Sequence, residues 1–183
     1  MLNRQNDTRR NWGEHPFVVL VGLLAALATI IAFVRDEGQK PSVEPPIPPA
    51  AVIVEQSIVR VPANQYWHDT GVKVQKRDWL EFKASGSWWS GIGMTGPEGQ
   101  SSFSRNSCGE CPIPDGNLGE LVGKVGPDLF KVGKSSTQVV TQDSNLYLTM
   151  NENTGPCKDG RAGSCYEDNN GSLEVKVTVW RIK

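Results

Sequence analysis

The feature that most constrains this chain is an apolar run from Phe17 to Val34 that contains no charged and no amide side chain. As a helix, with a rise of about 1.5 Å per residue, the run would be about 27 Å long, close to the thickness of the hydrocarbon core of a bilayer. A helix buried in a soluble domain normally keeps a polar stripe, which this run lacks. The sequence therefore predicts one transmembrane helix over residues 17–34.

A cleavable signal peptide is the alternative interpretation, because residues 26–28 read Ala-Leu-Ala and have the small-x-small form of a cleavage site. The apolar run continues beyond that point and is longer than the apolar region of most signal peptides, which favours an uncleaved anchor. Basic residues Arg4, Arg9 and Arg10 precede the helix. The positive-inside rule then predicts a cytoplasmic segment 1–16 and a single-pass membrane protein whose C-terminal part is extracytoplasmic, in the periplasm or at the cell surface.

Residues 35–57 are predicted to form a linker. Five prolines lie between Pro41 and Pro49. Proline fixes φ and removes a backbone donor, so this stretch favours an extended polyproline conformation that acts as a semi-rigid spacer.

Strand periodicity dominates residues 58–183. Apolar side chains alternate with polar ones from Leu173 to Val179, from Leu80 to Ala84 and from Leu146 to Met150, the pattern of half-buried strands. Turn-rich stretches separate them, and no long helical apolar stripe is present. The fold class predicted for this region is all-β, an antiparallel β-sandwich or jelly roll, preceded by the one N-terminal helix.

Composition excludes several functions. Nineteen Lys and Arg face twenty Asp and Glu, which gives a net charge of −1 and no electrostatic footprint for nucleic acid. Only two histidines, His15 and His68, are present, and no catalytic triad or nucleotide loop is evident. The chain is therefore predicted not to be an enzyme; the carboxylate pair Glu152 and Asp168 acting on a glycosidic bond is the minor alternative.

Four cysteines, an even number, fall in the outer region: Cys108, Cys111, Cys157 and Cys165. This favours disulfides in an oxidising compartment, with three pairings open. The short step from Cys157 to Cys165 favours a bond between them, which leaves Cys108 with Cys111. The latter two also form a C-x2-C motif, so a zinc or redox role is a less favoured alternative.

The best candidates for ligand binding lie in the polar loop 151–172, between two predicted strands. This loop is rich in carboxylate and amide side chains. Calcium takes six to eight oxygen ligands, often from loops. Asp168, Asn169 and Asn170, followed by Gly171, can present such oxygens from a tight turn. The alternative is an ordinary solvated hairpin loop, since these are also turn residues. The EF-hand pattern is absent.

Five segments form an ordered set that covers most of residues 58–182: 77–88, 96–99, 121–126, 146–152 and 168–175. In this order and spacing they resemble the PA-IL-like bacterial galactose-binding lectins. The resemblance implies a small galactose-binding-like β-sandwich, one calcium ion held by its loops, and a sugar whose hydroxyls bind that calcium directly.

Carried over by position, the resemblance implies that Glu152, Asp168 and Asn169 bind the calcium through their side chains. Backbone carbonyls near Ser90 and Cys165 would complete the set. Glu152 is one methylene longer than the family's aspartate, and Asp168 replaces an amide by a charge. An insertion carrying Cys157 and Cys165 interrupts the calcium loop, and the histidine and glutamine that contact galactose in the family have no clear counterpart between residues 101 and 108.

The sugar would contact Glu152 and Asp168 through the metal, and an exposed Trp89 or Trp88 could provide an apolar platform, although at least one of these rings is expected in the core. The sequence thus predicts a membrane-anchored, extracytoplasmic, calcium-dependent carbohydrate-binding module for a galactose-like glycan. The alternative function is a structural or protein-interaction β-sandwich of the cell envelope that binds no sugar. The oligomeric state is left open.

Overall fold

The computed structural model describes residues 44–101, 110–155 and 163–183, all within a compact unit from Val43 to Lys183. The predicted segment 1–16, the predicted helix 17–34 and most of the predicted linker lie outside the described residues. Among the residues that are described, no helix has the length and apolar character needed to cross a bilayer.

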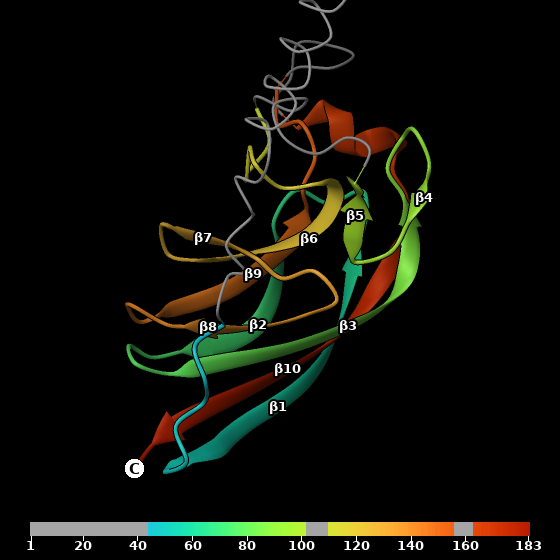
Figure 1. Cartoon of the computed structure of the whole chain (residues 1–183). Coiled ribbons are helices and arrows are strands. Elements are labelled where there is room, and N and C mark those ends of the chain that lie inside the picture. The colour runs from blue at the N-terminus through green and yellow to red at the C-terminus, as the bar shows by residue number, and fades with distance from the viewer. Residues whose placement is uncertain (1–43, 102–109, 156–162) are drawn as a thin grey trace, which may run out of the picture. The chain divides into compact units, whose positions relative to one another are not determined.

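The described chain is an all-β sandwich of two antiparallel sheets, as predicted (Figure 1). The first sheet has the order β1 (Ala51–Pro62), β10 (Asn170–Ile182), β3 (Trp79–Trp89) and β4 (Met94–Thr95), and β8 (Ser135–Val139) also pairs with β3. The second has the order β2 (His68–Val74), β9 (Ser144–Met150), β6 (Leu118–Val125) and β5 (Glu98–Gln100), and β7 (Asp128–Lys131) also pairs with β6. A short 3-10 helix, η2 (Ser164–Asp168), precedes β10.

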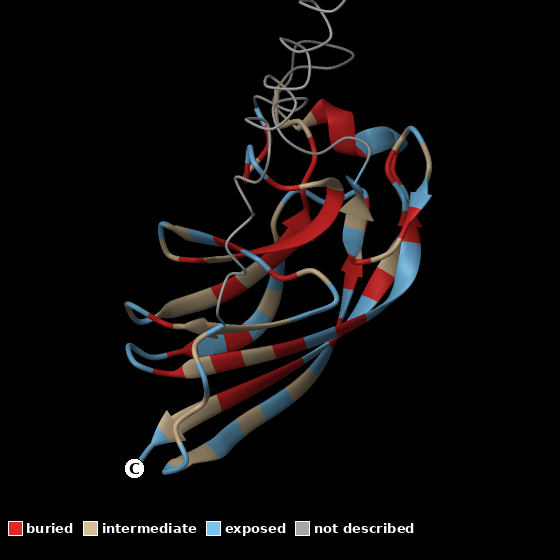
Figure 2. Ribbon diagram, viewed as in Figure 1, coloured by how far each residue is buried: buried red, intermediate tan, exposed pale blue. Residues whose placement is uncertain are grey.

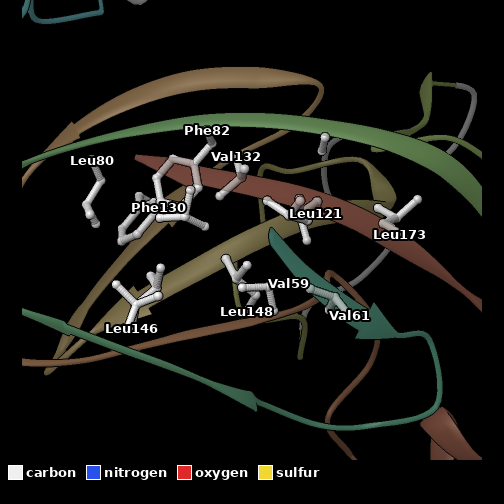
Figure 3. Close-up of a cluster of buried hydrophobic side chains, with 14 of the residues drawn as sticks. Val59, Val61, Leu80, Phe82, Leu121, Phe130, Val132, Leu146, Leu148 and Leu173 are labelled. Atoms are coloured by element: carbon white, nitrogen blue, oxygen red, sulfur yellow. The ribbon is translucent and has the colours of Figure 1, made fainter. Parts of the chain in front are cut away.

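The predicted alternation is realised strand by strand. In β10 the apolar residues from Leu173 to Val179 are buried and the charged residues between them are exposed. Side chains from both sheets meet between the layers, among them Phe82 of β3, Phe130 of β7 and Leu148 of β9 (Figure 3). Burial of apolar surface in this layer is the main force that holds the two sheets together.

The first strand begins at Ala51, whereas the sequence placed residues 51–57 in the linker. Ala51 pairs with Ile182, and the ladder continues to Pro62 opposite Ser172, with one register shift between Ile53 and Glu55. The alternation in this segment is weak, because β1 lies at the edge of its sheet and several of its apolar side chains are exposed. The position at which β1 begins therefore depends on its pairing with β10 and cannot be read from the local alternation of apolar and polar residues.

The start of β10 and the ends of β3 and β9 lie at the same end of the sandwich. Asn170, at the start of β10, pairs with Trp89, at the end of β3. The indole nitrogen of buried Trp88 donates a hydrogen bond to the Gly119 carbonyl at 2.9 Å, and the Gly119 amide donates to the Asn151 carbonyl, also at 2.9 Å. These bonds bring the end of β9 to the same end of the molecule, where the predicted site residues lie.

Candidate functional site

A tight hairpin between β3 and β4 forms one wall of the candidate site. The Ser90 amide donates to the Gly93 carbonyl at 3.0 Å, which closes the turn Ser90–Gly93. Gly91 has a φ of 74°, a conformation that favours glycine. A Cβ at residue 91 would lie 3.3 Å from both carboxylate oxygens of Asp168. The glycine thus allows the hairpin backbone to approach this carboxylate closely.

The second wall comes from the chain that follows β9. Glu152 is buried, with 8% of its surface exposed, and its Oε1 accepts a hydrogen bond from the Asn153 amide at 2.9 Å. Burial raises the pKa of the Glu152 carboxyl, and the nearby charge of Asp168 raises it further. An ionised Glu152 is therefore disfavoured unless a positive charge comes close to it.

The third wall is η2 together with the residue that ends it. Tyr166 is fully buried and holds this helix against the end of β9, because its hydroxyl donates to the Met150 carbonyl at 2.8 Å. Burial also raises the pKa of the Tyr166 phenol. The hydroxyl therefore stays protonated and remains a donor at neutral pH.

Asn169 directly follows η2 and carries an unusual buried atom. The residue is only 5% exposed, its Nδ2 donates to the Ala63 carbonyl at 3.4 Å, and its Oδ1 has no hydrogen-bond partner among the described residues. A buried acceptor without a partner is unfavourable and calls for an explanation, such as an ion or water.

The three walls enclose a pocket of about 140 Å³, which we call the end pocket. Four of the five residues that the sequence nominated for calcium line it: Ser90, Glu152, Cys165 and Asp168. Gly91 and Ile92 complete the lining. The fifth nominated residue, Asn169, is adjacent to Asp168 in the chain and is not among the lining residues. Segments separated by about 60 positions in the sequence thus meet in one pocket, at the end where η2 and β4 lie (Figure 1).

The donor set of the end pocket is oxygen-rich and carries two carboxylates. Within the residues that the structure describes, no group of three or more His, Cys, Asp and Glu side chains is placed to hold a metal ion. Carboxylates, amides and backbone carbonyls are the ligand types that calcium takes. The pocket lining supplies the carboxylates of Glu152 and Asp168, and the Asn169 Oδ1, unpaired within the described part of the chain, belongs to the residue that follows Asp168.

The two tryptophans proposed for a sugar platform divide as expected. Trp88 is fully buried in the core, and Trp89 is 40% exposed. Trp89 does not line the end pocket, although it immediately precedes Ser90, which does. Ile92, which the sequence analysis did not single out, lines the pocket and is 53% exposed. Ile92 is therefore the exposed apolar side chain that borders the end pocket, and Trp89 lies outside its lining.

Sequence reasoning missed Tyr166 and Gly91. Tyr166 lies in the polar loop next to Cys165. An aromatic residue in such a loop is the feature of the sequence that could have predicted packing of the loop onto the core. Gly91 belongs to a Gly-Ile-Gly sequence, which by itself indicates only a turn.

The structure describes two of the four cysteines, Cys111 and Cys165, and both are disulfide-bonded. Cys108 and Cys157 lie outside the described residues. The pairing of Cys157 with Cys165 and of Cys108 with Cys111 therefore stays a prediction.

Comparison with known proteins finds a similar solved structure and no matching family. No protein-family model matches the chain, and no curated protein matches it. A solved structure described as "EclA N-terminal domain; PllA-like lectin" is similar to it, with 22% sequence identity and a TM-score of 0.48. The similarity covers 69% of this chain and 97% of the other. A likeness of this degree carries no argument about the site or its ligand.

A substitution at Gly91 should damage the end pocket selectively. In Gly91→Ala the new methyl group would press on the Asp168 carboxylate, so we expect weaker calcium binding, with a loss of stability of about 1–2 kcal/mol from the positive φ. Gly71→Ala is the matched control, since Gly71 has a φ of 75° and no atom within 4 Å of its Cβ position. Calorimetric titration with calcium should separate the two variants; equal affinities would show that residue 91 does not border a calcium site.

Proposed function

We propose that the sandwich domain is a calcium-dependent carbohydrate-binding module. The observation that carries the proposal is the end pocket: Ser90 and, about 60 positions later, Glu152, Cys165 and Asp168, all predicted as calcium ligands from the sequence, line one small cavity. The sequence resemblance to calcium-dependent lectins supports the same function. The proposed role is binding, without catalysis.

In this proposal the calcium ligands are the carboxylates of Glu152 and Asp168, the Asn169 amide oxygen, and backbone carbonyls at or near Ser90 and Cys165. Calcium, when bound, supplies open coordination positions that two neighbouring sugar hydroxyls can take. The chain itself supplies two carboxylates that line one pocket, and a bound cation would favour the ionised form of both. The raised pKa of Glu152 reflects the burial and repulsion that a cation would relieve.

The apolar side chains around the pocket would select the ligand. Sugar rings have apolar faces that pack on exposed hydrocarbon. Ile92 borders the pocket, and Trp89, on the neighbouring strand end, would extend the contact to a second ring. A galactose-like hexose with two vicinal hydroxyls is the proposed ligand class.

Binding to a glycan array, with and without a chelator, tests the proposal. We expect a set of glycans to bind in millimolar calcium and to be lost when the chelator removes it, because the sugar is held through the ion. Binding that persists in the chelator, or a complete lack of binding in calcium, would contradict the proposal. The second result would favour a structural module of the cell envelope.

We also propose that residues 17–34 anchor this domain in a membrane, with the sandwich on the extracytoplasmic side. The charge-free run supports the anchor, and the disulfide-bonded state of Cys111 and Cys165 supports an oxidising compartment. Carbonate extraction should leave the protein in the membrane pellet. Recovery of a soluble form that begins near Thr29 would instead indicate a cleaved signal peptide.

A further inference from the structure

The outer face of the first sheet carries a second hollow, far along the strands from the end pocket. Its volume is about 60 Å³, and we call it the sheet groove. Its lining comes from three neighbouring strands, β1, β10 and β3: Ile53, Gln56, Glu81, Lys83, Lys176, Thr178 and Trp180. Figure 2 shows exposed and half-exposed residues along this part of β1, at the edge of the sheet.

One end of the sheet groove is apolar and aromatic. Trp180 is half-buried and pairs with Ile53 on one side and Trp79 on the other. The Trp180 indole nitrogen donates a hydrogen bond to Glu81 Oε2 at 3.3 Å, which restricts the ring. Ile53 is 50% exposed. The groove therefore has a fixed aromatic ring beside an exposed aliphatic side chain.

The middle of the groove is formed by hydrogen-bonding side chains in register. Gln56 and Glu81 are the cross-strand partners of Thr178 on its two sides. Gln56 Nε2 donates to Thr178 Oγ1 at 3.3 Å. An amide, a hydroxyl and a carboxylate next to an aromatic ring are the groups that recognise the hydroxyls and apolar face of a sugar.

The other end of the groove is cationic. Lys83 and Lys176 are direct cross-strand partners, and like charges in this arrangement repel. Lys83 forms an ion pair with Glu81 at 3.0 Å, whereas Lys176 has no ion pair with any described residue. One positive charge at this end is thus uncompensated, which favours an anionic ligand.

We propose that the sheet groove is a second saccharide site, specific for acidic sugars that carry a carboxylate, such as uronic acids. The sugar ring lies against Trp180, its hydroxyls contact the exposed Gln56, which the buried Thr178 holds in place, and its carboxylate faces Lys176 and Lys83. The site contains no cation-binding set, so its binding does not require calcium and does not depend on the function proposed for the end pocket.

The end pocket and the sheet groove are spaced so that one polysaccharide could bind both. Glu81 lies in β3 and Ser90 directly follows that strand, nine residues further on, so at about 3.3 Å per residue their separation is at most about 30 Å. A polysaccharide with several sugars could contact both, and linking two weak contacts raises the overall affinity.

The test is titration of the full chain with a hexameric oligogalacturonate in the presence of a chelator, with maltohexaose as the neutral probe. We expect the acidic probe alone to bind, and binding to weaken as salt rises. Trp180→Ala and Lys176→Gln should each weaken it by on the order of tenfold, through lost ring contact and lost charge. Lys73→Gln, at an exposed lysine on β2, is the matched control and should change nothing.

Three results would overturn the proposal: no binding of the acidic probe, equal binding of both probes, or an equal effect of Lys73→Gln and Lys176→Gln. A second copy of the chain is the competing occupant of this face, because Ile58 next to the groove is 70% exposed. Dimers that Ile58→Lys abolishes, in a protein that does not bind the acidic probe, would establish that occupant instead. Loss of calcium-dependent binding in Asp168→Ala leaves the sheet groove unaffected, so the two functions fail independently.

Discussion

Replacement of Asp168 by alanine should abolish calcium binding by this protein. Asp168 lines the end pocket, and in the proposed site its carboxylate would supply both a negative charge and a metal ligand. Calcium at 100 times its dissociation constant stabilises a native state by about 2.7 kcal/mol, which corresponds to a rise in Tm on the order of 10 °C for a domain of this size. We expect this rise in wild type and none in Asp168→Ala.

Glu167→Ala is the matched control for this experiment. Glu167 is the preceding residue of η2, carries the same charge and does not line the end pocket. Its variant should retain the calcium-induced rise. A rise in Asp168→Ala equal to that of wild type, or its loss in both variants, would contradict the role assigned to Asp168.

Replacement of Trp88 by alanine should destabilise the domain more than any other change considered. The ring is fully buried, and its nitrogen donates to the Gly119 carbonyl at 2.9 Å. Removing a large buried aromatic side chain typically lowers the free energy of unfolding by about 3–5 kcal/mol. The variant would also leave the Gly119 carbonyl without this donor.

The neighbouring Trp89 is the matched control for Trp88, since it lies on the same strand and is 40% exposed. Trp89→Ala should lower the free energy of unfolding by about 1 kcal/mol or less. Urea denaturation of both variants measures the difference. Similar losses of unfolding free energy in the two variants would show that the assignment of Trp88 to the buried face of β3 and of Trp89 to its exposed face is wrong. Weaker sugar binding in Trp89→Ala, with stability retained, would support its proposed part in the platform.

Strand periodicity was sufficient to predict the architecture where one face of a strand is buried. Leu173 to Val179 and Leu146 to Met150 alternate cleanly because their inward side chains fill the layer between the sheets. The start of β1 was missed because Ile53 and Val54, at a register shift on an edge strand, are both exposed and break the alternation. The start of β1 is fixed by its pairing with β10, more than 100 residues later in the chain, and the sequence near residue 51 does not indicate this pairing.

The sequence nominated four of the residues that line the end pocket and missed Gly91 and Ile92, whereas the nominated Asn169 and Trp89 do not line it. Glu152 and Asp168 were nominated because an ordered set of segments resembled a lectin family, and the fold brings them to one pocket. The approach of Gly91 to Asp168, and the hold of Tyr166 on the end of β9, depend on contacts between distant segments. These contacts could not be predicted, because the sequence around Gly91 is typical of any turn and the sequence around Tyr166 is typical of any polar loop.

The most direct measurement of the central claim is a crystal structure of the protein grown with calcium and galactose, with anomalous scattering used to locate the ion. The account predicts a calcium ion in the end pocket, bound by Glu152, Asp168 and Asn169, with two hydroxyls of one sugar ring also bound to it. A sugar bound elsewhere without contact to an ion, or an end pocket that stays without calcium at millimolar concentration, would contradict it.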